Sequence, residues 1–189
     1  GRNGIGEVHL PAVTASTPQQ SAVDFLIAAT QQYGAELVVV PTGPLTNLAA
    51  AIQQYPSLVD QIGQITLMGG ALTVPGNVSA TTEANMAQDP EAAQVVFTSG
   101  APLAMVGLDV TLRTLLTKQE TARWRTLNTA TVTAFADMVD YYIKAYPVTS
   151  PDLGGCSLPY PFAVGLPFDP SLAPLLALVL TVAPTSPTT

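Results

Sequence analysis

Apolar residues alternate along the chain between two spacings. Over residues 18–33 they recur at helical spacing, and Gly34 supplies a stop. The segment 36–40 follows, and its run of branched apolar residues after Glu36 predicts a buried strand of a parallel sheet covered on both faces. Pro44 starts the next predicted helix, which extends over 45–55. The first third of the chain therefore predicts the order helix, strand, helix.

The same alternation continues further along. Strands are predicted at 65–68 and at Leu103–Val106, and helices at 92–98 and 118–145. Asp89 and Pro90 have the residue types of an N-cap and a first helical position, so they mark the start of the third predicted helix. A long loop is expected between the second strand and this helix. Strands that alternate with helices predict an α/β fold with a mostly parallel sheet and flanking helices.

Charge and composition narrow the range of functions that the chain could have. Charged residues make up 10% of the chain, against roughly 25% in an average soluble domain. The net charge is -7, and no Lys or Arg occurs between Asn3 and Leu112, which disfavours binding to nucleic acid or to acidic membranes. Cys156 is the only cysteine, so no disulfide can form within the chain. We expect a cytoplasmic protein with one domain over 1–182 and a low-complexity, disordered tail over 183–189.

The polar residues that could bind a ligand gather after the second predicted strand. Ligands of open parallel sheets bind outside the carboxyl ends of the strands. Asn77, Glu83 and Asn85 lie there within nine residues, and their amides and carboxylate offer the donors and acceptors that a polyol requires. A solvated polar loop with Glu83 on the surface is the plainer alternative. The residues alone leave both interpretations open.

An ordered set of short motifs extends this picture. The motifs lie at 40–49, 65–70, 76–77, 83–85, 89–93 and 105–111. Together they resemble the inosine–uridine-preferring nucleoside hydrolase family over nearly all of residues 1–172. The resemblance implies a Rossmann-like nucleoside hydrolase fold, truncated at both ends, with 1–182 as a partial domain. It also implies hydrolysis of ribonucleosides to ribose and a free base with the help of Ca²⁺, and assembly as a homodimer or homotetramer.

The resemblance assigns roles to five positions. Asn77, Glu83 and Asn85 match the residues that hold the ribose hydroxyls. Met68 matches a contact in the sugar pocket, although a core methionine at a strand end is an equally good interpretation. Thr42 matches a threonine whose backbone oxygen binds Ca²⁺, a cation that prefers oxygen ligands. A ribonucleoside is therefore the expected substrate.

Two departures from the family pattern affect the expected activity. The family's Asp-rich N-terminal motif, which supplies metal ligands and the base, would lie upstream of Gly1. Pro159 and Tyr160 stand where the family has a His-Asp pair. Proline has no acid function, and neutral tyrosine is a poor calcium ligand. We therefore expect weak or no hydrolysis by this chain, and the alternative is a non-catalytic nucleoside-binding, ribose-binding or structural remnant of the family.

Overall fold

The computed structural model describes residues 2–146, 154–180 and 182. The chain divides into two compact units, which are described separately. One comprises Gly1–Thr17 and Leu112–Leu158, and the other comprises Pro18–Thr111 and Pro159–Thr189. The tail expected at 183–189 lies outside the described residues.

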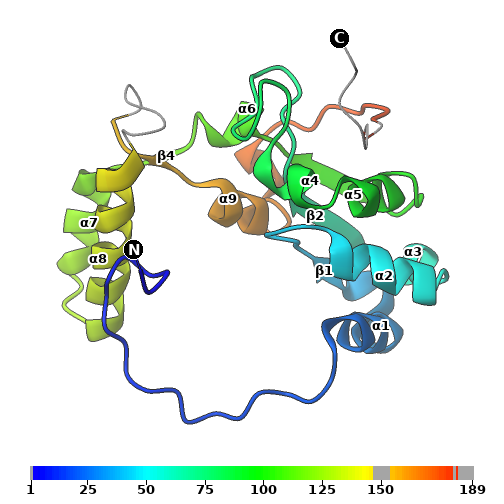
Figure 1. Cartoon of the computed structure of the whole chain (residues 1–189), viewed down its shortest axis with the longest axis horizontal. Helices are drawn as coiled ribbons and strands as arrows, with labels where there is room; N and C mark the ends of the chain where they lie inside the picture. Colours follow the sequence, from blue (N-terminus) through cyan, green and yellow to red (C-terminus); the bar gives the residue numbers. More distant parts are fainter. Residues whose placement is uncertain (1, 147–153, 181, 183–189) are drawn as a thin grey trace. The chain divides into compact units, whose positions relative to one another are not determined.

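A parallel three-stranded sheet forms the centre of the second unit (Figure 1). Its strands are β1 (Val38–Val39), β2 (Gln64–Met68) and β3 (Leu103–Val106), in the order β1-β2-β3. Both pairings are parallel, and Ile65 lies opposite Val39 on one side and Leu103 on the other. The parallel α/β fold expected from the alternating pattern is therefore confirmed.

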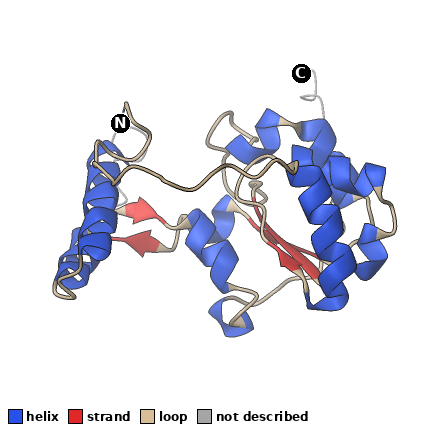
Figure 2. Cartoon of the chain, turned by 90° about the horizontal axis from the view of Figure 1, so that it is seen from below, coloured by secondary structure: helices blue, strands red, loops and turns tan. Residues whose placement is uncertain are grey.

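Helices lie on both sides of this sheet (Figure 2). They are α1 (Ala22–Tyr33), α2 (Thr46–Gln54), α3 (Leu58–Gln61), α4 (Ala84–Gln88), α5 (Pro90–Phe97), α6 (Leu108–Thr111) and α9 (Pro159–Gly165), with 3-10 turns at Gly34–Glu36 and Pro170–Leu172. Asp89 caps α5 as predicted, because its Oδ1 accepts a hydrogen bond from Ala92 N at 3.0 Å. A hydrogen bond from the Thr46 hydroxyl, followed by the one from Ala92 N, lowers the pKa of Asp89.

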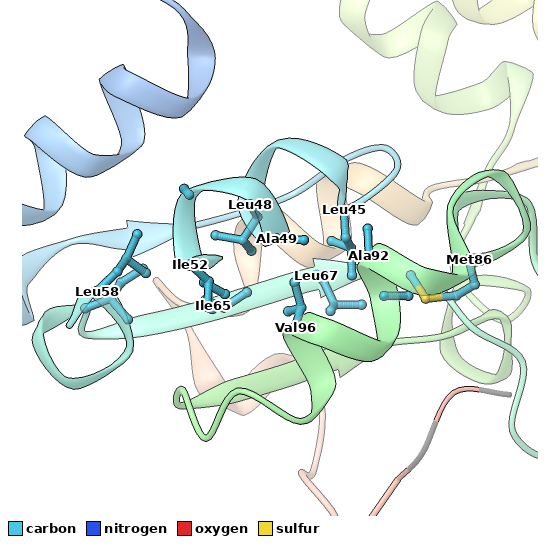
Figure 3. Close-up of a cluster of buried hydrophobic side chains, with 13 residues drawn as sticks. Leu45, Leu48, Ala49, Ile52, Leu58, Ile65, Leu67, Met86, Ala92 and Val96 are labelled. Atoms are coloured by element: carbon cyan, nitrogen blue, oxygen red, sulfur yellow. The ribbon is translucent and has the colours of Figure 1, made fainter. Parts of the chain in front are cut away.

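The main apolar core lies between β2 and the helices α2 and α5 (Figure 3). Ile65 and Leu67 are two positions apart on β2, so their side chains point to the same face of the sheet. There they pack with Leu48 of α2 and Val96 of α5, and all four side chains are buried. This packing fixes the strand ends, from which the loops of the candidate site extend.

The first unit is built on a helix pair and a short two-stranded antiparallel sheet. Strand β4 (Leu115–Leu116) pairs antiparallel with β5 (Cys156–Ser157). The single helix predicted over 118–145 is wrong, because the structure contains α7 (Lys118–Arg125) and α8 (Ala130–Ala145) instead. After α7 ends, Asn128 adopts a left-handed φ of 51°, and the Thr129 side chain caps α8, so a new helix begins there.

None of the helices in the described ranges is long and apolar enough to cross a membrane.

Candidate functional site at the carboxyl ends of the strands

Backbone hydrogen bonds tie the carboxyl ends of the three strands together. Met68 N donates to Pro41 O, beyond the end of β1, at 3.2 Å. Gly69 N donates to Val106 O, at the end of β3, at 3.1 Å. Thr42 follows Pro41 directly, so it lies at the same edge of the sheet as Met68. Residues at the ends of all three strands therefore lie at one edge of the sheet.

Glu83 ends the loop over 70–83 and caps α4 with its own carboxylate. Its Oε2 accepts hydrogen bonds from Gly70 N at 3.1 Å, Asn85 N at 2.9 Å and Met86 N at 3.2 Å. Only 2% of the residue is exposed. A buried carboxylate requires such donors, because burial removes its hydration. The alternative with Glu83 on the surface is therefore wrong.

Asn85 joins α4 to the end of β2. Its Nδ2 donates to Met68 O at 3.1 Å and lies 3.3 Å from Met68 Sδ. Asn85 is 4% exposed and Met68 is 2% exposed. Met68 is thus a buried strand-end residue, and it is also in direct contact with a side chain of the site.

Asn77 reaches back across the loop to the same helix. Its Oδ1 accepts a hydrogen bond from Ala84 N at 2.9 Å, and the residue is exposed. The structure therefore connects Asn77, Glu83 and Asn85 through the first turn of α4.

Each of these three side chains uses one polar atom to hold the protein and leaves another open. The open atoms are Nδ2 of Asn77, Oε1 of Glu83 and Oδ1 of Asn85. Within the described residues, Thr111 Oγ1 is the only fully buried side-chain nitrogen or oxygen without a hydrogen-bond partner, so Oε1 of Glu83 and Oδ1 of Asn85 are not fully buried. One donor, one neutral acceptor and one carboxylate oxygen suit adjacent hydroxyl groups, which both donate and accept.

The described residues do not fit a calcium ion. Ca²⁺ takes six to eight oxygen ligands and usually several carboxylates. No group of three or more His, Cys, Asp and Glu side chains able to hold a metal occurs in residues 2–146, 154–180 and 182. Thr42 is exposed, and its carbonyl stays a predicted ligand. Pro159 and Tyr160 begin α9, and neither provides a carboxylate.

Asp109 is a site residue to which the sequence assigned no role. It lies in α6, directly after β3, and its carboxylate accepts hydrogen bonds from Leu72 N at 3.0 Å and Thr73 N at 2.5 Å. Burial is the largest single influence and raises the pKa of Asp109, but the hydrogen bonds from Thr73 and Leu72 together outweigh it and lower the pKa. Its motif at 105–111 was recognised, whereas its partners lie more than thirty residues away, where no sequence signal indicated them.

The fold and these groups define an α/β protein that presents a set of polar atoms, suited to adjacent hydroxyls, at the carboxyl edge of a parallel sheet. The family model described as "Inosine-uridine preferring nucleoside hydrolase" matches residues 1–189. The chain belongs to the inosine–uridine preferring nucleoside hydrolase family.

Solved structures and sequences of relatives agree with this assignment. The chain is similar to the purine-preferring ribonucleoside hydrolase from Gardnerella vaginalis, with 54% identity and a TM-score of 0.95 over 98% of this chain and 58% of that one. A plant nucleoside hydrolase has 31% identity and a TM-score of 0.83 over 90% of this chain and 54% of its own. The probable uridine nucleosidase 2 of Arabidopsis thaliana is 35% identical over 172 residues, which are 91% of this chain and 53% of that protein. The chain thus spans about half the length of the relatives that it matches.

Proposed function

We propose that this chain binds a ribonucleoside through its ribose, and that it corresponds to the ribose-holding part of a ribonucleoside N-ribohydrolase. The reaction of such an enzyme converts a nucleoside and water to ribose and a free base. The observation that carries the proposal is the shared design of Asn77, Glu83 and Asn85, each held by one polar atom and open at another.

The open atoms suit the 2′ and 3′ hydroxyls of ribose. Nδ2 of Asn77 can donate to a hydroxyl oxygen, while Oε1 of Glu83 and Oδ1 of Asn85 can accept hydroxyl protons. A bond from a hydroxyl to a carboxylate is stronger than one between neutral groups, so Glu83 should contribute most to affinity. Membership of the family supports a nucleoside as the ligand. The relatives' names include purine-preferring and uridine-cleaving enzymes, so both base types are suitable probes.

Hydrolysis makes demands that the described residues do not meet. Cleavage of a glycosidic bond passes through an oxocarbenium-like state and requires an activated water and, commonly, an acid for the leaving group. Glu83 and Asp109 use their carboxylates to accept backbone hydrogen bonds, and Pro159 has no ionisable side chain. We therefore infer that this chain by itself binds nucleosides with little or no turnover.

Isothermal titration calorimetry with inosine, uridine and their 2′-deoxy counterparts tests the binding. We expect the 2′-deoxy compounds to bind about tenfold more weakly, because each lacks one hydroxyl that bonds to a charged group. Glu83→Gln should weaken binding similarly, since its amide oxygen can replace Oε2 at the backbone donors while its NH₂ group replaces the open acceptor. Gln53→Ala, on the exposed side of α2, is the control.

Two results would contradict the proposal. Equal affinity for ribo- and 2′-deoxyribonucleosides would remove the role of the hydroxyls, and absence of any binding would favour a purely structural remnant. Release of the free base, followed by chromatography with and without added Ca²⁺, tests the catalytic part. Rapid Ca²⁺-dependent release would show that the chain is an enzyme in its own right.

A further inference from the structure

One side chain outside the three proposed ribose contacts holds the loop that carries Asn77. Asp109 accepts hydrogen bonds from Leu72 N at 3.0 Å through Oδ2 and from Thr73 N at 2.5 Å through Oδ1. The Thr73 hydroxyl also donates to Oδ1. Hydrogen bonds to a carboxylate are stronger than those between neutral groups. The first half of the loop is therefore fixed to α6, beside which it is drawn in Figure 1.

The backbone around Asp109 is shaped to receive this loop. Leu108 N donates to Gly70 O at 2.9 Å. A Cβ atom at Gly107 would lie 2.9 Å from Asp109 Oδ2 and 3.1 Å from Gly70 O, so a larger residue would push the two segments apart. Gly70 has a φ of 84°, a left-handed conformation that favours glycine. Both glycines thus permit the close approach that brings the carboxylate to Leu72.

The span from the anchored residue to Asn77 is short and stiff. Only three residues separate Thr73 from Asn77, and one of them is Pro75, whose ring fixes φ. Gly76 N then donates to Ala80 O at 3.1 Å, so the tip of the loop folds back on itself. A displacement at Thr73 would therefore be passed on to Asn77.

We propose that Asp109 is a positioning residue for nucleoside binding, because its carboxylate sets the place of the loop that presents Asn77 to the ribose. Both carboxylate oxygens bind the loop, so Asp109 acts through Asn77 and makes no contact with the sugar. The assignment of a nucleoside as the ligand rests on the proposed function, whereas the hydrogen bonds by which Asp109 holds the loop are independent of it.

Amide hydrogen exchange, measured by NMR on the full chain, tests the hold directly. The reporter is the amide of Ala84, which donates a hydrogen bond to Asn77 Oδ1 and makes none with Asp109. In Asp109→Asn, we expect Ala84 to exchange about tenfold faster, as for the loss of one strong hydrogen bond, while the amide of the core residue Val96 stays protected. The affinity for inosine should fall by a similar factor.

A milder pair of variants tests the same hold through its partner. Thr73→Val removes the hydroxyl and leaves both backbone bonds to Asp109, so Ala84 exchange and inosine affinity should change about threefold, in the direction seen for Asp109→Asn. Thr73→Ser keeps the hydroxyl and should restore both. Thr131→Val, at an exposed position of α8, is the matched control and should change neither.

The outcomes separate this inference from the proposed function. Unchanged Ala84 exchange in Asp109→Asn would overturn the positioning role, even if nucleosides bind. Faster exchange with unchanged inosine affinity would also overturn it, since the loop would then not serve binding. If the Val96 amide also loses its protection in Asp109→Asn, that variant has unfolded and Thr73→Val takes its place. An unchanged exchange rate of the Ala84 amide in Thr73→Val would then overturn the positioning role. Failure of the wild-type chain to bind inosine would overturn the proposed function and the role of Asp109 in binding, whereas Ala84 exchange in Asp109→Asn would still decide whether Asp109 holds the loop.

Discussion

Replacing Glu83 by alanine should destabilise the second unit. The substitution leaves three backbone donors, at Gly70, Asn85 and Met86, without their shared acceptor. Loss of an N-cap costs about 1 kcal/mol, and leaving a buried donor unpaired costs about 1–3 kcal/mol. Asn85 and Met86 are buried, so water cannot fully replace the carboxylate. Because the contributions overlap, we expect the free energy of unfolding to fall by about 2–4 kcal/mol.

Urea denaturation followed by circular dichroism measures this change, and Glu83→Gln provides the comparison. Glutamine retains an acceptor for the same donors, so it should cost about 1 kcal/mol or less. The capping role of Glu83 would be refuted if Glu83→Ala lay within about 0.5 kcal/mol of the wild type, the range of ordinary surface substitutions. It would also fail if Gln and Ala destabilised the chain equally, because the effect would then come from charge and not from capping.

Three further changes probe the loop, the acid response and the core. Gly76→Ala would place a Cβ 2.2 Å from Thr82 O, so the loop tip must open, and calorimetry should show weaker inosine binding with little change in the unfolding midpoint; a tip that keeps wild-type affinity would contradict the geometry. The lowered pKa of Asp109 stabilises the fold above the ordinary aspartate value of about 3.9, and this contribution is lost as the pH falls through the lower folded value, so urea titrations at several acidic pH values should show a flatter decline for Asp109→Asn than for the wild type. Leu67→Ala, at a fully buried position of β2, should lower the free energy of unfolding by about 2–5 kcal/mol in the same assay, and a loss below about 1 kcal/mol would mean that the core can collapse around the cavity.

The sequence predicted the parts of the fold that depend on local patterns. A run of branched residues marked β1, short apolar stretches marked β2 and β3, and the Asp89-Pro90 pair marked the start of α5. The short helix α4 was missed, because it has five residues and its cap is a glutamate, a residue type outside the usual N-cap set. The break between α7 and α8 was missed because the apolar stripe continues across it. The left-handed backbone conformation of Asn128 cannot be predicted from the spacing of apolar residues.

In the candidate site, likewise, some features follow from local sequence spacing and others depend on tertiary packing. Asn77, Glu83 and Asn85 are close in the chain, so their spacing was enough to group them. The burial of Glu83 followed from tertiary packing, which brings Gly70 N to its carboxylate. The role of Asp109 depends on a contact between two loops at the ends of neighbouring strands, and residues so far apart carry no common local signal.

Each of the three polar side chains of the candidate site is held to the protein by one atom and leaves another open. This arrangement has a consequence for the thermodynamics of binding. A side chain that must be ordered by its ligand loses about 0.5–1.5 kcal/mol of rotamer freedom on association. Asn77, Glu83 and Asn85 are each ordered by hydrogen bonds to the protein before any ligand arrives. The entropy of ordering them is therefore lost during folding, and a bound ribose would meet rotamers that are already fixed.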